Sequence, residues 1–233
     1  MEDTTYFLLS LQNWQALWLS IKLASVSTFL LILLGTPLAW WLHNSKHKST
    51  TVIEAIIALP LVLPPTVMGF YLLLAFAPDT WLGFSWLNLT GEPLAFSFSG
   101  LVLGSLIYSL PFVVQPLQTA FSGIDQHYLE SASTLGISPR ARFFSIVMPL
   151  SRYGFLTAAT LGFAHTLGEF GIVLMIGGSI PGETLVSSIA IFQHVETLEY
   201  TEAHTLSAIL IVGSFSMLLF IYGLNKKYRY RTL

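Results

Sequence analysis

Five stretches of about 20 predominantly apolar residues constrain the fold of this chain more than any other feature of its sequence. A helix needs about this many apolar residues to cross a bilayer, because each residue advances it by about 1.5 Å. The sequence therefore predicts membrane-spanning helices at Leu17–Leu42, Val52–Ala77, Ser99–Phe121, Gly154–Gly178 and His204–Leu224. A sixth apolar run, Thr184–Val195, has about a dozen residues, and we expect it to form a short helix on the outer side.

Composition supports the same interpretation. Charged residues make up 9% of the chain and apolar residues 54%, whereas soluble domains carry about 25% charged residues. We predict an all-α integral membrane protein in which residues 1–233 form one transmembrane domain. The net charge of −2 argues against nucleic-acid binding, and the absence of cysteine excludes disulfides and thiolate metal sites. No positively charged n-region precedes the first span, so we expect no removable signal peptide.

The basic residues predict how the chain is oriented in the membrane. With five crossings, nine of the ten Lys and Arg residues fall on one side: Lys46, Lys48, Arg140, Arg142, Arg152, Lys226, Lys227, Arg229 and Arg231. We expect this side to be cytoplasmic, with the N-terminus outside and the C-terminus in the cytoplasm. Lys22 lies near the outer end of the first span, where its ammonium group can reach the interface.

Prolines interrupt the second and third spans. Pro60, Pro64 and Pro65 lie in the second span, and Pro111 and Pro116 lie in the third. A proline inside a helix frees a carbonyl and kinks the helix. Broken backbone at membrane depth is tolerated where it is buried in protein or lines an aqueous cavity. These spans therefore either border a transport pathway or contain ordinary packing kinks.

The segment between the third and fourth spans, residues 125–149, has the pattern of two short helices around a turn. Asp125 can cap the first helix, and Gly136 suits the left-handed backbone that ends it. Ser138 and Pro139 are a typical N-cap and first residue for the second helix. We expect a rigid bracket on the cytoplasmic side, with Arg140 and Arg142 facing water or lipid headgroups. The alternative is an amphipathic helix lying on the membrane.

The sequence ESASTLGISPRARFFSIVMP in this segment resembles the EAA motif of ABC-importer permeases. The matching positions are Glu130, Ala132, Gly136, Ile146 and Pro149. Ser131 and Met148 depart from the pattern, but each change is small or conserves volume. In that family the segment docks into a separate ATPase subunit. The resemblance implies that Glu130 caps or anchors the docking surface and that Gly136 allows the turn, while Arg140 is a further candidate contact.

The resemblance also implies a set of partners and a location. Such permeases have the MetI-like fold and work as homodimers with two ATP-binding subunits and an extracytoplasmic binding protein, in the bacterial cytoplasmic membrane. The chain has no G-x-x-x-x-G-K-[ST] phosphate loop. ATP and magnesium would therefore bind to the ATPase partner, and we expect this chain to bind membrane lipid, no cofactor and no metal, and to catalyse no reaction itself.

The blocks LPLVLPP, LGEFG and IPGET are similar to those of permeases in molybdate ABC importers. Permeases for sulfate and tungstate share much of the pattern, and these substrates stay as alternatives. An oxyanion pathway favours hydroxyls, amides and helix N-termini over fixed carboxylates. The candidate pathway or gate residues are Pro64, Pro65, Thr66, Ser109, Gln115, His165 and Glu169. Serine and threonine in membrane helices also often bond to their own helix or a neighbouring one.

Glu169 is an ionisable residue inside the fourth span, and His165 precedes it by four positions. Such residues in membranes usually have a function, yet a carboxylate would repel a doubly charged oxyanion. We therefore expect a structural role, in which Glu169 bonds to His165, to backbone, to a partner subunit, or to Lys22 as its counter-charge. The alternative is a proton relay in a secondary transporter, but the paired repeats common in such transporters are not found.

His194 and His204 lie among several acidic residues in the outer segment. Histidine and carboxylate together can ligate zinc. Because no closely spaced histidine pair is present, we expect solvated charges there and no metal site.

Overall fold

The computed structural model describes residues 10–45, 47 and 49–229, and the regular structure of these residues is entirely helical. This confirms the predicted all-α architecture. Lys46, Lys48 and Arg231, which entered the prediction of orientation, lie outside the described residues. The helices are α1 Leu11–Asn44, α2 Ser49–Ala58, α3 Pro65–Phe76, α4 Trp81–Thr90, α5 Phe98–Ser122, α6 Gln126–Thr134, α7 Pro139–Arg142, α8 Met148–Leu150, α9 Arg152–Leu167, α10 Gly171–Gly177, α11 Ser187–Glu196 and α12 Tyr200–Arg229.

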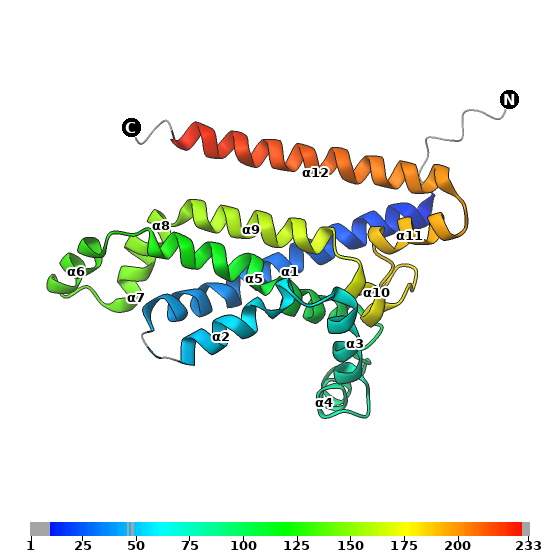
Figure 1. Cartoon of the computed structure of the whole chain (residues 1–233), viewed down its shortest axis with the longest axis horizontal. Helices are drawn as coiled ribbons and strands as arrows, with labels where there is room; N and C mark the ends of the chain where they lie inside the picture. Colours follow the sequence, from blue (N-terminus) through cyan, green and yellow to red (C-terminus); the bar gives the residue numbers. More distant parts are fainter. Residues whose placement is uncertain (1–9, 46, 48, 230–233) are drawn as a thin grey trace.

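Helices α1, α5 and α9 pack against one another and form the centre of the bundle, while α12 lies alongside them (Figure 1). Small residues allow this close approach, as is common between membrane helices. A Cβ atom added at Gly162 of α9 would lie 2.8 Å from Cγ2 of Val113, and one added at Gly35 of α1 would lie 3.2 Å from Cγ1 of the same side chain. Val113 of α5 therefore fills the space that both glycines leave.

Two apolar clusters fill the bundle, one toward each end. The cluster nearer the start of α1 includes the fully buried Leu23, Leu101 and Ile172. The cluster nearer α6 includes Leu117 and Phe121. Both clusters draw on α1 and α5, so these two helices hold the ends of the bundle together.

Three helical segments are long and apolar enough to cross a membrane: α1, α5 and residues 200–219 of α12. The predicted span Val52–Ala77 is instead a pair, Ser49–Leu61 and Pro65–Phe76, bent by 109°. The predicted span Gly154–Gly178 is likewise a pair, Arg152–Leu167 and Gly171–Gly177, bent by 59°. The described residues therefore provide up to five crossings if each pair counts as one. The break in the second span lies at the prolines that the sequence predicted to interrupt it, whereas the break in the fourth span was not predicted.

The two breaks differ in the residues that form them. Pro64 takes an extended backbone conformation, with φ −56° and ψ 135°, immediately before Pro65 starts α3. Proline disfavours the helical conformation in the residue before it, so consecutive prolines end the preceding turn. The second break is the segment Gly168–Phe170, where Gly168 is the C-cap of α9.

The broken pairs pack against each other through α3 and α10. A Cβ atom added at Gly171 would lie 2.7 Å from Cβ of Pro65, which places one break directly against the other. A Cβ added at Gly69 would lie 2.7 Å from Cβ of Met175 and 3.3 Å from Cα of Ile172. The crossing of α3 and α10 therefore depends on glycine in both helices.

The ends of the bundle differ in what they carry. Helices α6 and α7 lie at the same end as the C-terminal part of α12, whereas the start of α1 and the short α11 lie at the opposite end (Figure 1). Helix α11 has 10 residues and overlaps the predicted short helix at Thr184–Val195. This arrangement agrees with the inner and outer ends expected from the sequence, while the orientation in the membrane stays a prediction.

We predict that Gly69→Ala destabilises the α3–α10 contact by about 1–3 kcal/mol, because the new methyl group overpacks a closed interface. The measurement is the midpoint of thermal unfolding of the detergent-purified chain. Gly213→Ala is the matched control, since a Cβ there meets nothing within 4 Å. Equal midpoints for the two variants would contradict the close packing of α3 on α10.

Candidate functional site

A cleft of about 610 Å³ opens between α5 and α9 in the half of the bundle that leads to α6. The C-terminal half of α5, the start of α9 and the 3₁₀ turn Leu59–Leu61 form its walls. The polar residues that line it are Gln115, Thr119, Ser151, Tyr153 and Thr157. None of its lining residues carries a charge. The cleft is therefore electrically neutral, with a few polar side chains in a mainly apolar lining.

A second hollow of about 420 Å³ lies between α2 and α5 and shares Gln115 with the cleft. Nε2 of Gln118 donates a hydrogen bond of 2.9 Å to Oε1 of Glu54 at its wall. Carboxylate and amide groups are costly against lipid tails. The face formed by α2 and α5 therefore meets water or protein. Of the sequence-based pathway candidates, Gln115 is the one that lines both hollows.

A polar seam joins α5 to α9 inside the bundle. The buried hydroxyl of Ser109 lies 2.9 Å from Nδ1 of His165 and 3.1 Å from Oγ1 of Thr166. The His165 ring stacks on Phe112 with ring centroids 3.7 Å apart, and its centroid lies 4.9 Å from that of Tyr108. Because Phe112 also lines the cleft, the seam is one side chain away from the cleft.

Glu169 lies in the break between α9 and α10 and is only 5% exposed. Oγ of Ser105 donates a hydrogen bond of 3.1 Å to Oε2 of Glu169. The other carboxyl oxygen, Oε1, is buried and has no hydrogen-bond partner among the described residues. Oγ of Ser188 in α11 donates a 2.7 Å hydrogen bond to the backbone carbonyl of Glu169. Glu169 is therefore held from α5 and from α11.

Two of the partners expected for Glu169 are wrong. The helix ends at Leu167, so the four-residue spacing no longer brings His165 and Glu169 together; each bonds to a separate serine of α5. Nζ of Lys22 lies 4.3 Å from the centroid of the Phe98 ring. No hydrogen bond joins Glu169 to His165 within the described part of the chain, so the contact that a proton relay needs is missing there.

The remaining candidates in the second span lie at its break. Pro64 is exposed and caps α3, Pro65 packs on Gly171, and Thr66 is exposed in the first turn of α3. All three lie outside the lining of both hollows. The structure therefore separates two groups of candidates that the sequence treated together: the break at Pro64–Thr66, and the cleft around Gln115.

The segment between α5 and α9 has the local structure that the sequence predicted. Oδ1 of Asp125 caps α6 by accepting from the backbone N–H of His127 at 2.9 Å, and Oγ of Ser138 caps α7 by accepting from Ala141 at 3.3 Å. Gly136 has φ +74°, in the left-handed region. The backbone N–H groups of Gly136 and Ile137 donate to the carbonyls of Ser133 and Ala132 and so end α6. The predicted helix–glycine–helix bracket is confirmed.

Side chains of the bracket divide into an inner and an outer set. Ala132 is buried, Ile146 is partly buried, and Glu130, Arg140 and Pro149 are exposed. Nη1 of Arg142 donates a hydrogen bond of 3.4 Å to the carbonyl of Leu129, so Arg142 joins α7 to α6 and does not simply face solvent as expected. The most exposed large apolar residues of the bracket are Tyr128 (59%), Leu135 (79%) and Phe144 (63%).

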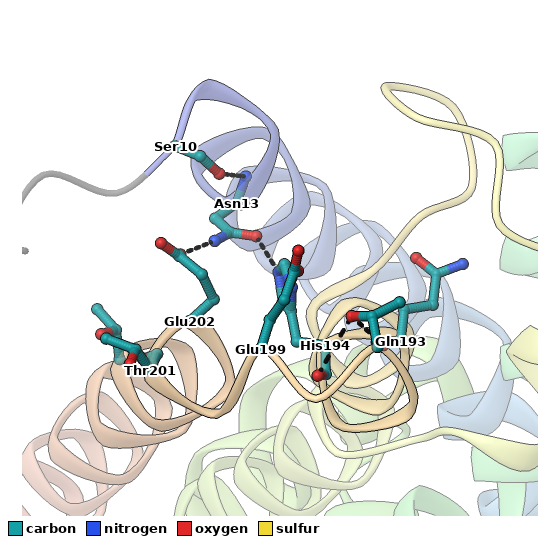
Figure 2. A network of polar contacts seen from close by, with 9 residues as sticks. Ser10, Asn13, Gln193, His194, Glu199, Thr201 and Glu202 are labelled. Carbon is teal, nitrogen blue, oxygen red and sulfur yellow. Dashed lines mark hydrogen bonds and ion pairs between the residues drawn. The ribbon is translucent and has the colours of Figure 1, made fainter.

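At the opposite end, a polar network joins three helices (Figure 2). Nδ2 of the buried Asn13 in α1 donates to Oε2 of Glu202 in α12 at 2.6 Å, and Oδ1 of Asn13 lies 2.9 Å from Nε2 of His194 in α11. Nδ1 of His194 lies 2.7 Å from Oε2 of Glu199. The described residues contain no group of three His, Cys, Asp or Glu side chains placed to hold a metal ion.

Three polar residues of the site were missed from the sequence: Ser105, Ser188 and Glu54. The spacing of Ser105 and Ser109, four residues apart on α5, would have placed both hydroxyls on one helix face. Glu54 is a carboxylate inside a predicted span, which is a signal of function that was available. Ser188 offered no such signal, because its partner is a backbone carbonyl 19 residues away.

Broken spans, a cleft without charged residues and an exposed bracket are together the features of a membrane permease. The chain belongs to the family of binding-protein-dependent transport system inner membrane components, whose model matches residues 31–230. It is 51% identical over 215 residues to the molybdenum transport system permease protein ModB of Azotobacter vinelandii, which covers 92% of this chain and 95% of the relative.

A sulfate transport system permease, cysT of Marchantia polymorpha, is 33% identical over 200 residues, covering 85% of this chain and 68% of the relative. Among solved structures, a bacterial ABC transporter that imports the polysaccharide alginate matches with a TM-score of 0.75 and 15% identity. That match covers 94% of this chain and 80% of the other. It confirms the importer-permease fold expected from the sequence.

We predict that Ser109→Ala lowers the free energy of unfolding by about 1–3 kcal/mol, because His165 and Thr166 both lose a buried hydrogen-bond partner. The readout is thermal or denaturant unfolding in detergent. Ser85→Ala serves as the control, since the exposed Ser85 hydroxyl bonds only to the carbonyl of Trp81 in its own helix. If the Ser109 variant were as stable as the Ser85 variant, the hydrogen bonds of Ser109 would not contribute to the stability of the bundle.

Proposed function

We propose that this chain is the membrane-spanning permease subunit of an ATP-driven importer that moves molybdate inward across a bacterial cytoplasmic membrane. The observation that carries this proposal is the identity to a molybdenum permease, which extends over nearly the full length of both chains. The chain itself catalyses no reaction in this proposal; ATP hydrolysis takes place on a separate subunit.

Sulfate is the second candidate substrate, and tungstate is the third. Support for sulfate is weaker, because the chain covers only 68% of the sulfate permease that it resembles. The three oxyanions carry the same charge; molybdate and tungstate are nearly equal in size, and sulfate is smaller. The walls of a neutral cleft provide little discrimination between them, so an extracytoplasmic binding protein performs the selection.

In this proposal the α5–α9 face around the neutral cleft forms one wall of the pathway, and a second copy of the chain forms the other. The hydroxyl and amide groups of Gln115, Thr119 and Thr157 provide weak hydrogen bonds to a passing oxyanion. Passage requires binding that is weak enough for release. A cleft lined without fixed charge meets this requirement, because a ring of arginine or lysine would hold a dianion too tightly.

The bracket of α6 and α7 is the proposed docking element for the ATPase subunit. Its exposed Tyr128, Leu135 and Phe144 are large apolar side chains that a protein partner would cover. The hydrogen bond from Arg142 to Leu129 braces the two short helices, so that movement of the partner is passed to α9. Exposed Glu130 and Arg140 are the polar candidates for contact with that partner.

The outer end is the proposed docking side for the binding protein, with the N-terminus outside and the C-terminus in the cytoplasm. The sequence from residue 178 to residue 203 contains four glutamates and no lysine or arginine. These glutamates repel a free dianion that approaches from solution. Delivery by a docked protein that already encloses the anion avoids this repulsion.

The proposal is tested by uptake of labelled molybdate into vesicles that contain this chain, its ATPase subunit and its binding protein. We expect uptake that requires internal ATP and that tungstate inhibits while excess sulfate does not. Inhibition by sulfate at equal concentration would favour the sulfate alternative. Uptake that ignores ATP and follows a proton gradient would overturn the importer assignment.

We predict that Gly136→Val abolishes association with the ATPase subunit, because a β-branched residue is strongly disfavoured at φ +74°. Gly136→Asn is the matched variant, since asparagine tolerates the left-handed region, and we expect it to keep association. A Cβ at this position meets no atom within 4 Å, so the effect of valine comes from the backbone alone. Co-purification of the two subunits measures the result. Normal association of the valine variant would contradict the docking role of the bracket.

A further inference from the structure

Glu169 is the one acidic or basic side chain that is buried among the described residues. The cleft and the bracket described above make no use of it. Its position is also unusual, because it lies in the three-residue break where α9 ends and α10 begins at an angle of 59°. A buried ionisable group at a bend needs a physical explanation.

Among the described residues, the surroundings of the carboxyl group contain hydroxyls but no cation that pairs with it. Oε2 accepts one hydrogen bond from Ser105, and Oε1 has no partner in the described part of the chain. The nearest candidate counter-charge in the sequence analysis, Lys22, lies over the Phe98 ring. His165 and Tyr108, the other titratable side chains of the α5–α9 seam, are in ring contact with each other, with centroids 4.9 Å apart and planes tilted by 43°.

An ionised carboxylate fits this site poorly. A buried charge needs a partner of opposite sign or several hydrogen bonds that satisfy its lone pairs. Glu169 has one side-chain hydrogen bond and an oxygen with none. The uncharged carboxylic acid has a much smaller need for solvation, and it keeps the ability to bond to Ser105.

We infer that Glu169 is a positioning residue that acts as an uncharged latch, holding the break between α9 and α10 against α5 and α11. Its side chain is held by Ser105 of α5 at 3.1 Å, and its backbone carbonyl is held by Ser188 of α11 at 2.7 Å. This inference rests on the proposed function only in that transport is one of its readouts.

The latch explains why a carboxyl group can lie in an anion transporter without opposing its substrate. An uncharged group exerts no repulsion on a dianion, and the Glu169 side chain lies in the bundle interior, outside the lining of both hollows. Its role is to hold the α9–α10 break against α5 and α11. It sets the direction of α10, which packs on α3 at the other broken span.

The test compares two variants of the assembled importer in molybdate uptake. Glu169→Ala removes the latch, and we expect the maximal rate to fall by about tenfold while KM for molybdate changes little, because no substrate contact is lost. Glu169→Gln keeps an uncharged hydrogen-bonding group of the same size, and we expect it to restore the rate to within about twofold of wild type. A glutamine variant as impaired as the alanine variant would overturn the latch.

Thr160→Val is the matched control for loss of a polar group from the fourth span. Oγ1 of Thr160 bonds only to the carbonyl of Leu156 in its own helix at 2.7 Å, so we expect uptake by this variant to equal that of wild type. A loss as large as that of Glu169→Ala would mean that any polar deletion in this span disrupts transport, which also overturns the specific role of Glu169.

Infrared spectroscopy tests the charge state without any transport assay. The spectrum of wild type minus that of Glu169→Gln at neutral pH should contain the C=O stretching band of a protonated carboxyl group. Its absence would show an ionised Glu169 and overturn the inference, whatever the substrate is. Wild-type complex that takes up no molybdate but shows the band would instead reject the proposed substrate and retain the uncharged latch.

Discussion

The constraint on which the rest of this structure depends is that lipid cannot satisfy backbone polar groups. A helix satisfies them within itself, and any interruption must be covered by protein or water. This chain interrupts two of its spans and places the interruptions against each other, with Pro65 packed on Gly171. Glycine on α10 and proline at the start of α3 are therefore parts of one contact. The tight crossing of α3 and α10 follows from this need to cover both breaks.

The same constraint sorts the polar side chains by their surroundings. Three serine hydroxyls in the bundle join helices: Ser109 bonds to α9, and Ser105 and Ser188 bond to Glu169 at the break. Amides and the Glu54 carboxylate gather on the open α2–α5 face instead. An interior network fixes helix directions, whereas an open polar face needs a watery or proteinaceous neighbour. The chain thus combines an interior held by hydrogen bonds between helices with an open polar face that needs a neighbour. This combination suits a subunit that works in an assembly.

Sequence reasoning was most successful where local chemistry decides the structure. The caps at Asp125 and Ser138 and the left-handed Gly136 follow from neighbouring residues, and so does the existence of the apolar helices. It failed for Glu169, whose partner Ser105 lies 64 residues earlier on another helix. The prolines announced a break near Pro64, but its angle depends on how α3 packs on α10. Periodicity along one helix carries no information about such long-range contacts.

The network at Asn13 also limits the order in which the chain can be completed during synthesis. Asn13 and Glu202 are 189 positions apart, and His194 lies between them in the sequence. The ribosome must therefore translate nearly all of the apolar helices before α1 can form these hydrogen bonds at its N-terminal end. Until then, Asn13 lacks the hydrogen bonds to Glu202 and His194 that it makes in the folded chain. A chain that ends before α11 and α12 lacks both of these partners for Asn13.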